Sequence, residues 1–157
     1  MNHALLSLLA FASLAIATPS ARAMSPAVPG DVAHSVVAAG GYDVVSYRTG
    51  EKPVRGNGNH VVVHDGVTYL FQSDANAKTF RGDPERYAPA FGGYCAYGVA
   101  VGKKFVGDPD VWAVVDDRLY LNLDTKIQGL WTKDVAGNVR KAQSNWQRIR
   151  AVPAAEL

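Results

Sequence analysis

The side chain with the most distinctive chemistry is Cys95, the single cysteine of a 157-residue chain. It directly follows a Gly92-Gly93 pair and Tyr94. A cysteine thiolate is a soft metal ligand and a redox-active group, whereas a free thiol often packs as a small apolar side chain. Without a second cysteine it cannot form a disulfide within the chain. The residue types leave three roles open: metal ligand, redox group and buried apolar side chain.

The imidazoles of His60 and His64 are the candidate nitrogen ligands to accompany the thiolate. They lie four positions apart in a predicted strand, which spaces them by about 13 Å along one face. They therefore cannot bind one ion together, and each is an alternative to the other as the partner of Cys95. A thiolate with one imidazole suits Cu(I), which accepts soft donors. The alternative is that both histidines are solvated or hydrogen-bonded to backbone carbonyl groups.

Two further side chains are expected around such a site rather than bound to its ion. The carboxylate of Asp43 could accept hydrogen bonds from the backbone near the Gly92-Gly93 turn or from a metal ligand. Its alternative is a capping role within a turn. Tyr94, next to the cysteine, would line a pocket or pack in the core.

An enzyme would need a base beside the nucleophile and a place for developing negative charge. Cys95 with His64 could form a thiol dyad, but no sequence signature of a thiol enzyme surrounds the cysteine. The sequence also contains no phosphate-binding glycine loop, HExxH pair or serine nucleophile elbow. We therefore expect a binding module and not an enzyme, with the thiol dyad as a third hypothesis.

Residues 1–23 have the pattern of a secretory signal peptide, with an apolar run followed by Ala21-Arg22-Ala23, an A-x-A cleavage signature. We predict export to the periplasm and no membrane contact after the signal is removed. Residues 24–40, rich in small side chains, proline and glycine, are predicted to be a mobile leader. The domain is expected to cover residues 41–150. The net charge of +2 and the scattered basic residues argue against a nucleic-acid partner.

Two strand-turn-strand patterns predict the β-hairpins that would position these residues. In the first, residues 60–64 and 67–71 are β-branched and aromatic runs joined by Asp65-Gly66, a pair typical of a two-residue type I′ turn. This register pairs His60 with Phe71. The second hairpin joins residues 111–115 to residues 118–122.

Short helices are expected to pack on the hairpins, because capping residues precede each helical segment. The predicted caps are Ser73, Asp83 and Asp124, for helices over residues 74–81, 84–87 and 125–131. A last helix is predicted over residues 138–150, and residues 89–102 are predicted to be irregular or a bent strand. The fold class is α+β, with two β-hairpins in one small antiparallel sheet. The hairpin and its cap recur after 51 positions, which is either a common supersecondary pattern or an internal repeat.

Several of these residues resemble the YHS domain family. The resemblance spans residues 40–148, and its most specific part is the Gly92-Gly93-Tyr94-Cys95-Ala96 block, which is similar to an exported bacterial branch of that family. The other matching segments are Tyr69-Leu70-Phe71-Gln72-Ser73, Phe80 and Pro84-Glu85-Arg86-Tyr87. In metal-handling relatives, cysteines occupy the positions of Gln72 and Asn76, so the resemblance implies no thiolate cluster there in this chain.

The sequence therefore predicts a small exported module that binds or relays a soft metal ion, with copper as the expected ion and Cys95 as its ligand. A metal-trafficking protein is the expected partner, and the sequence predicts no oligomeric state. The alternative is a non-metal ligand-binding or protein-interaction module in which Cys95 is structural.

Overall fold

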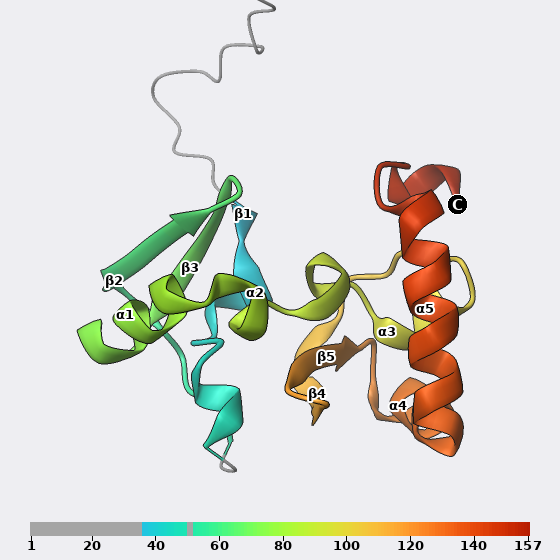
Figure 1. Cartoon of the computed structure of the whole chain (residues 1–157), viewed down its shortest axis with the longest axis horizontal. Helices are drawn as coiled ribbons and strands as arrows, with labels where there is room; N and C mark the ends of the chain where they lie inside the picture. Colours follow the sequence, from blue (N-terminus) through green and yellow to red (C-terminus); the bar gives the residue numbers. More distant parts are fainter. Residues whose placement is uncertain (1–35, 50–51) are drawn as a thin grey trace, which may run out of the picture. The chain divides into compact units, whose positions relative to one another are not determined.

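The computed structural model describes residues 36–49 and 52–157, which form an α+β fold, as predicted (Figure 1). The predicted signal peptide and residues 24–35 of the predicted leader lie outside the described residues. Val36–Val37, at the end of the predicted leader, form strand β1, which pairs with strand β3 (Val67–Phe71).

The first half of the fold, residues 36–88, is built on a three-stranded sheet (Figure 1). The strand order is β1-β3-β2, where β2 (Asn57–His64) runs antiparallel to β3 and β1 runs parallel to it. Two helices follow the sheet in the chain, α1 (Asp74–Gly82) and α2 (Pro84–Tyr87).

The turn of the first hairpin is the predicted one, but the strand pairing beyond it is not fully regular. Asp65 and Gly66 have φ angles of 49° and 75°, as a type I′ turn requires, and His64 pairs with Val67. The predicted pairing of His60 with Phe71 is wrong, because the register shifts and Phe71 pairs with Asn57. Glycine and asparagine at positions 57–59 form strands poorly, so extra residues bulge from β2 there.

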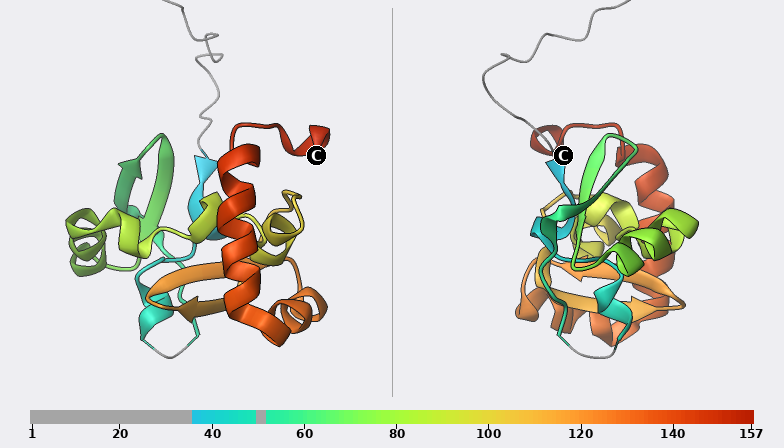
Figure 2. Two further views of the ribbon diagram at one scale, coloured as in Figure 1. Left: turned by 45° about the vertical axis from the view of Figure 1, so that its right-hand side comes forward. Right: turned by 90° about the vertical axis from the view of Figure 1, so that its left-hand side faces the viewer.

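The second half, residues 89–157, has a separate two-stranded sheet of β4 (Asp108–Val115) and β5 (Arg118–Asn122). The two hairpins therefore form two sheets and not the single antiparallel sheet predicted. Figure 2 shows the long last helix standing along this half. The helices here are α3 (Ala96–Ala100), α4 (Thr125–Trp131) and α5 (Val135–Ile149). Short 3-10 segments complete the described chain: η1 (Ala38–Gly41), η2 (Ser46–Arg48), η3 (Ala90–Gly93), η4 (Thr132–Asp134) and η5 (Ala154–Glu156).

The predicted helix caps are confirmed. The side chains of Ser73, Asp83 and Asp124 each accept a hydrogen bond from a backbone N–H in the first turn of the helix that follows. A fourth cap was not predicted: the carboxylate of Asp134 accepts from the N–H of Gly137 at 2.8 Å. Helix α5 therefore begins at Val135 rather than at residue 138.

The segment predicted to be irregular contains the short helix α3, and it packs against α5. Ala96 and Val99 of α3 are buried in the apolar core of the second half. This tertiary burial stabilises a helix that the glycine at position 98 disfavours locally. The predicted apolar stripe of the last helix is confirmed, since its members Val139, Ala142, Trp146 and Ile149 all belong to this core.

The turn, the hairpin and the capped helix after it recur in the two halves with the same backbone path, so this part of the recurrence after 51 positions is structural. Both hairpins lose regular register at the same relative place, between Asn57 and Val61 and between Asp108 and Trp112. Equivalent hydrogen bonds also recur: Gly56 N–H donates to the Gly41 carbonyl at 2.9 Å, and Gly107 N–H to the Gly93 carbonyl at 3.0 Å.

The turn before each hairpin repeats as well, in three consecutive residues with left-handed backbone angles. The φ angles are 46°, 57° and 86° at residues 39–41, and 56°, 63° and 83° at residues 91–93. Each turn leads to an inward side chain, Asp43 in the first half and Cys95 in the second. The N–H of Asp43 donates to Val54 and the N–H of Cys95 to Phe105, both to carbonyl oxygens, so the two residues occupy equivalent positions.

Candidate metal centre

Cys95 is completely buried at the N-terminal cap of α3. Its Sγ accepts a hydrogen bond from the backbone N–H of Gly98 at 3.3 Å, and its thiol donates to Oδ1 of Asn122 at 3.8 Å. Among the described residues, neither of these hydrogen bonds of the thiol involves an imidazole. The geometry therefore matches the buried structural role that the sequence left as an alternative for this residue.

His60 and His64 are both on β2 of the first half, where each meets a carboxylate instead of the thiol. Nδ1 of His60 lies 2.9 Å from Oδ1 of Asp74, and Nε2 of His64 lies 3.6 Å from Oδ2 of Asp65. The structure thus does not bring either histidine to Cys95 in the second half.

Asp43 is completely buried and acts as a cap, which was the alternative to a supporting role at an ion. Its Oδ1 accepts from the N–H of Val45 at 2.9 Å. Its Oδ2 accepts from the N–H of Gln72 at 2.9 Å and from Nδ2 of Asn76 at 2.7 Å. The carboxylate therefore connects its own turn to the start of α1. None of these three hydrogen bonds comes from the backbone of the Gly92-Gly93 turn.

Tyr94 packs at the edge of the second-half core. Its ring centroid lies 6.1 Å from that of Trp146, and Nζ of Lys104 lies 5.1 Å from the centre of the Tyr94 ring. The residue also lines a groove of about 250 Å³ between the two halves.

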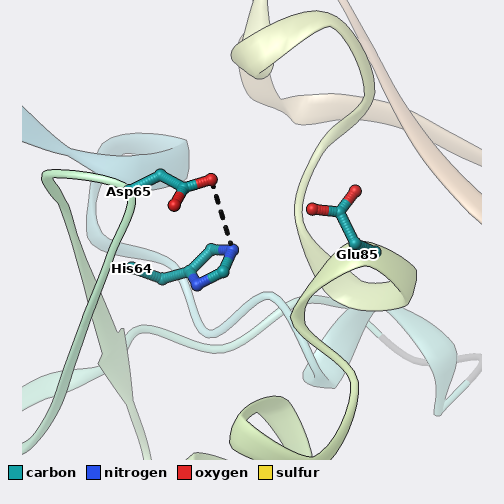
Figure 3. A group of neighbouring side chains, drawn as sticks. All are labelled: His64, Asp65 and Glu85. Atoms are coloured by element: carbon teal, nitrogen blue, oxygen red, sulfur yellow. Dashed lines mark ion pairs between the residues drawn. The ribbon is translucent and has the colours of Figure 1, made fainter.

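The structure does assemble one set of potential metal ligands around His64, which Figure 3 shows facing one another. His64 ends β2, Asp65 begins the hairpin turn, and Glu85 lies in the first turn of α2. One ligand atom from each residue lies within 4.8 Å of the other two. Within residues 36–49 and 52–157, this is the only group of three or more histidine, cysteine and acidic side chains so arranged.

Packing fixes the imidazole, whereas the carboxylates are free to adjust. The ring of His64 stands edge-on to Phe80, with 6.0 Å between ring centroids, and Phe80 is completely buried. The side chain of His64 is 30% exposed and that of Asp65 is 84% exposed. Glu85 is exposed too, but the cap by Asp83 fixes the backbone that carries it.

The two carboxylates create a negative electrostatic potential over this part of the first half. Tyr69 lies beneath them, with its ring 4.5 Å from that of Phe80. Burial raises the pKa of Tyr69, and the negative charges of Asp65 and Glu85 raise it further. A cation held between the carboxylates would offset that potential.

One imidazole nitrogen and two carboxylate oxygens suit a divalent transition metal better than Cu(I). Imidazole binds zinc, copper, iron and nickel, and carboxylates prefer harder ions than thiolates do. Among divalent ions, the general order of affinity reaches its maximum at Cu²⁺. The residues present therefore fit a divalent ion with open positions for water.

Sequence reasoning singled out His64 but missed both carboxylates. Asp65 is explained completely by its role in the hairpin turn, and Glu85 by its place in the first turn of a capped helix. The only local signal was the adjacency of His64 and Asp65. Glu85 joins them through the packing of α2, which no short pattern encodes.

The chain matches no protein-family model, no curated protein and no solved structure. The resemblance to the YHS domain family therefore stays a prediction. None of the helices among the described residues combines the length and the apolar character that crossing a membrane requires.

Proposed function

We propose that this protein is a non-catalytic, exported YHS-like module that binds a divalent transition metal, Cu²⁺ most tightly, through His64, Asp65 and Glu85. The observation that carries the proposal is the convergence of one imidazole and two carboxylates within 4.8 Å. The proposal keeps the metal-binding function expected from the sequence. It moves the ligands from Cys95 to the tip of the first hairpin.

The exposure of the ligands favours a carrier over a protein with a permanent structural ion. Asp65 and Glu85 reach solvent, so water or a ligand from another protein can enter the coordination sphere. His64 and Asp65 are adjacent, whereas Glu85 comes from a separate helix. Binding would therefore join the hairpin tip to α2 and stabilise the first half by mass action.

The test is a titration of the reduced protein with Cu²⁺, followed by calorimetry. Wild type should bind one ion, and His64→Ala should weaken binding by more than about tenfold, because even the loss of an outer-sphere partner costs roughly 10- to 100-fold. His60→Ala is the matched control, since His60 lies on the same strand and pairs with Asp74 instead. Cys95→Ser should bind like wild type. Binding that is lost in Cys95→Ser and retained in His64→Ala would contradict the proposal.

A protein-interaction module is the second candidate, and the outer face of the first-half sheet favours it. Val61 and Val63 on this face are 37% and 67% exposed. Their equivalents in the second half, Trp112 and Val114, pack with Tyr47 of the first half. A wild-type protein that binds no divalent metal in the titration would favour this candidate, because uncovered apolar faces are typical of interaction sites.

A further inference from the structure

The second half contains a buried hydrogen-bond donor that has no acceptor within the part of the chain that the structure describes. Asn122 ends β5 and has no exposed surface. Its Oδ1 accepts from the N–H of Tyr97 at 3.3 Å and lies 3.8 Å from Sγ of Cys95. Its Nδ2 has no hydrogen-bond partner among the described residues. Such groups are rare in folded proteins, because a buried donor without a partner is costly.

The orientation of this amide follows from its contacts. The Tyr97 N–H is a donor, so the atom that faces it must be the oxygen; a flipped amide would oppose two donors. The NH₂ group that remains is on the same amide whose oxygen faces the thiol of Cys95. The unpartnered donor is therefore part of the immediate surroundings of this sulfur.

Asp43, at the position equivalent to Cys95, accepts hydrogen bonds from more than its own turn. One of its carboxylate oxygens accepts from the backbone of that turn, and the other accepts from Nδ2 of Asn76. Sγ of Cys95 accepts from the backbone of its own turn, through Gly98. Asn122 is not the equivalent of Asn76, but among the described residues its Nδ2 is an unpartnered donor on the amide that faces the sulfur.

We propose that Cys95 is an oxidation site at which a hydroperoxide converts the thiol to a sulfenic acid, whose oxygen accepts the hydrogen bond from Nδ2 of Asn122. The thiol releases its proton as the sulfur attacks the hydroxyl oxygen of the hydroperoxide, so that the O–O bond breaks and an S–O bond forms. The sulfur loses two electrons, and the other oxygen leaves as water or an alcohol after taking up a proton. The modified side chain then presents an oxygen acceptor, as Asp43 does at the equivalent position. A sulfenic acid is reversible by thiols.

The glycine whose N–H contacts the sulfur is covered by a side chain from a surface loop. Gly98 contacts the sulfur through its N–H. A Cβ built on Gly98 would lie 3.1 Å from the ring of Phe105 and 3.5 Å from Cβ of Cys95, so this ring packs directly over the glycine. Phe105 is 48% exposed although the thiol beneath has no exposed surface. Our proposed route for a small oxidant to the buried sulfur is displacement of this ring.

The test oxidises the reduced full-length protein with hydrogen peroxide and traps the sulfenic acid with a cyclic 1,3-diketone, read by intact-protein mass. Wild type should give one adduct at Cys95, and Cys95→Ser should give none. Asn122→Asp keeps an oxygen for the Tyr97 N–H but removes the donor. It should shorten the lifetime of the sulfenic acid by roughly tenfold, the effect of one hydrogen bond. Phe105→Ala should speed the oxidation.

Absence of an adduct in native wild type, under conditions in which the unfolded chain is oxidised and gives the adduct, would overturn the proposal. Equal lifetimes in wild type and a folded Asn122→Asp variant would overturn it too. If circular dichroism shows that Asn122→Asp does not fold, the oxidation rate of Phe105→Ala is the deciding measurement. Faster oxidation than in wild type supports the proposal, and an unchanged rate contradicts it.

Discussion

Tyr47 of the first half packs its ring edge-on against Trp112 of the second, with ring centroids 5.2 Å apart and an angle of 86° between the planes. The Tyr47 hydroxyl donates to the carbonyl of Pro109 at 3.0 Å. Together with Leu119 and Leu121, which are also buried, the tyrosine forms an apolar cluster that crosses the boundary of the repeat. The two halves of the repeat are therefore held together by shared core residues.

Replacing Tyr47 should show how much of the stability depends on that contact. Tyr47→Ala should lower the free energy of unfolding by about 3–5 kcal/mol, the range for truncating a large buried aromatic side chain. Tyr47→Phe keeps the ring and loses only the hydroxyl bond, so it should cost about 1 kcal/mol. Urea denaturation followed by tryptophan fluorescence measures both variants. Equal costs for the two would mean that the ring packing does not stabilise the fold.

A charged cluster joins the halves at the surface, and its contribution should depend on pH. Asp117, in the turn of the second hairpin, lies 3.2 Å from Nε of Arg48 and 2.6 Å from Nε of Arg86. Desolvation raises the pKa of Asp117, but the hydrogen bonds and positive charges of Arg48 and Arg86 together outweigh it and lower the pKa below the ordinary value of 3.8.

Because the pKa of Asp117 is lower in the folded state than in the unfolded state, its charge stabilises the fold above pH 3.8. That contribution is lost as the pH falls through the folded-state pKa. Asp117→Asn should therefore be less stable than wild type near neutral pH, and the difference should shrink towards pH 2. Urea unfolding of both proteins across this range provides the measurement. A difference that does not change with pH would exclude this ion-pair contribution.

Asp43→Asn should destabilise the first half, because the new amide group replaces one acceptor with a donor. Both oxygens of Asp43 accept hydrogen bonds, including two from backbone N–H groups, and the side chain is completely buried. We expect a loss of about 3 kcal/mol in the free energy of unfolding, the upper range for a hydrogen bond to a charged group. Asp108→Asn, at an exposed position, is the control. Similar stabilities of the two variants would rule out the proposed capping role of Asp43.

The ionisation of Tyr69 should report on the two carboxylates of the candidate metal centre. Burial is the largest cause of the raised pKa of Tyr69, and the negative charges of the two carboxylates raise it further. The double variant Asp65→Asn, Glu85→Gln removes both charges, so the pKa of Tyr69 should fall. Ultraviolet titration of tyrosinate measures this, and the difference from a Tyr69→Phe protein isolates the residue. An unchanged pKa would show that the carboxylates exert no field at this ring.

Local sequence signals predicted the parts of the fold that two to four adjacent residues decide. Asp65-Gly66 determined the first turn, and Ser73 determined the start of α1. Helix α3 was not predicted, since burial against α5 stabilises it despite Gly98. The separation of the hairpins into two sheets also depends on tertiary packing.

The candidate site was less predictable than the fold. His64 could be singled out because an imidazole is an obvious ligand, but Glu85 reaches it only through the docking of α2. Cys95 was weighted as a ligand because a lone thiol has no disulfide partner. Its hydrogen-bond partners are Gly98, in its own turn, and Asn122, at the end of β5, and no local pattern encodes the second contact. Its equivalence with Asp43 is visible in the backbone and not in the residue types.

Electron paramagnetic resonance of the protein with one equivalent of Cu²⁺ identifies the atoms that bind the ion at the candidate metal centre. We expect one imidazole nitrogen with oxygen ligands, a nitrogen signal that disappears in His64→Ala, and a spectrum of Cys95→Ser that matches wild type. A spectrum with sulfur ligation, or one that His64→Ala leaves unchanged, would contradict the proposed metal centre.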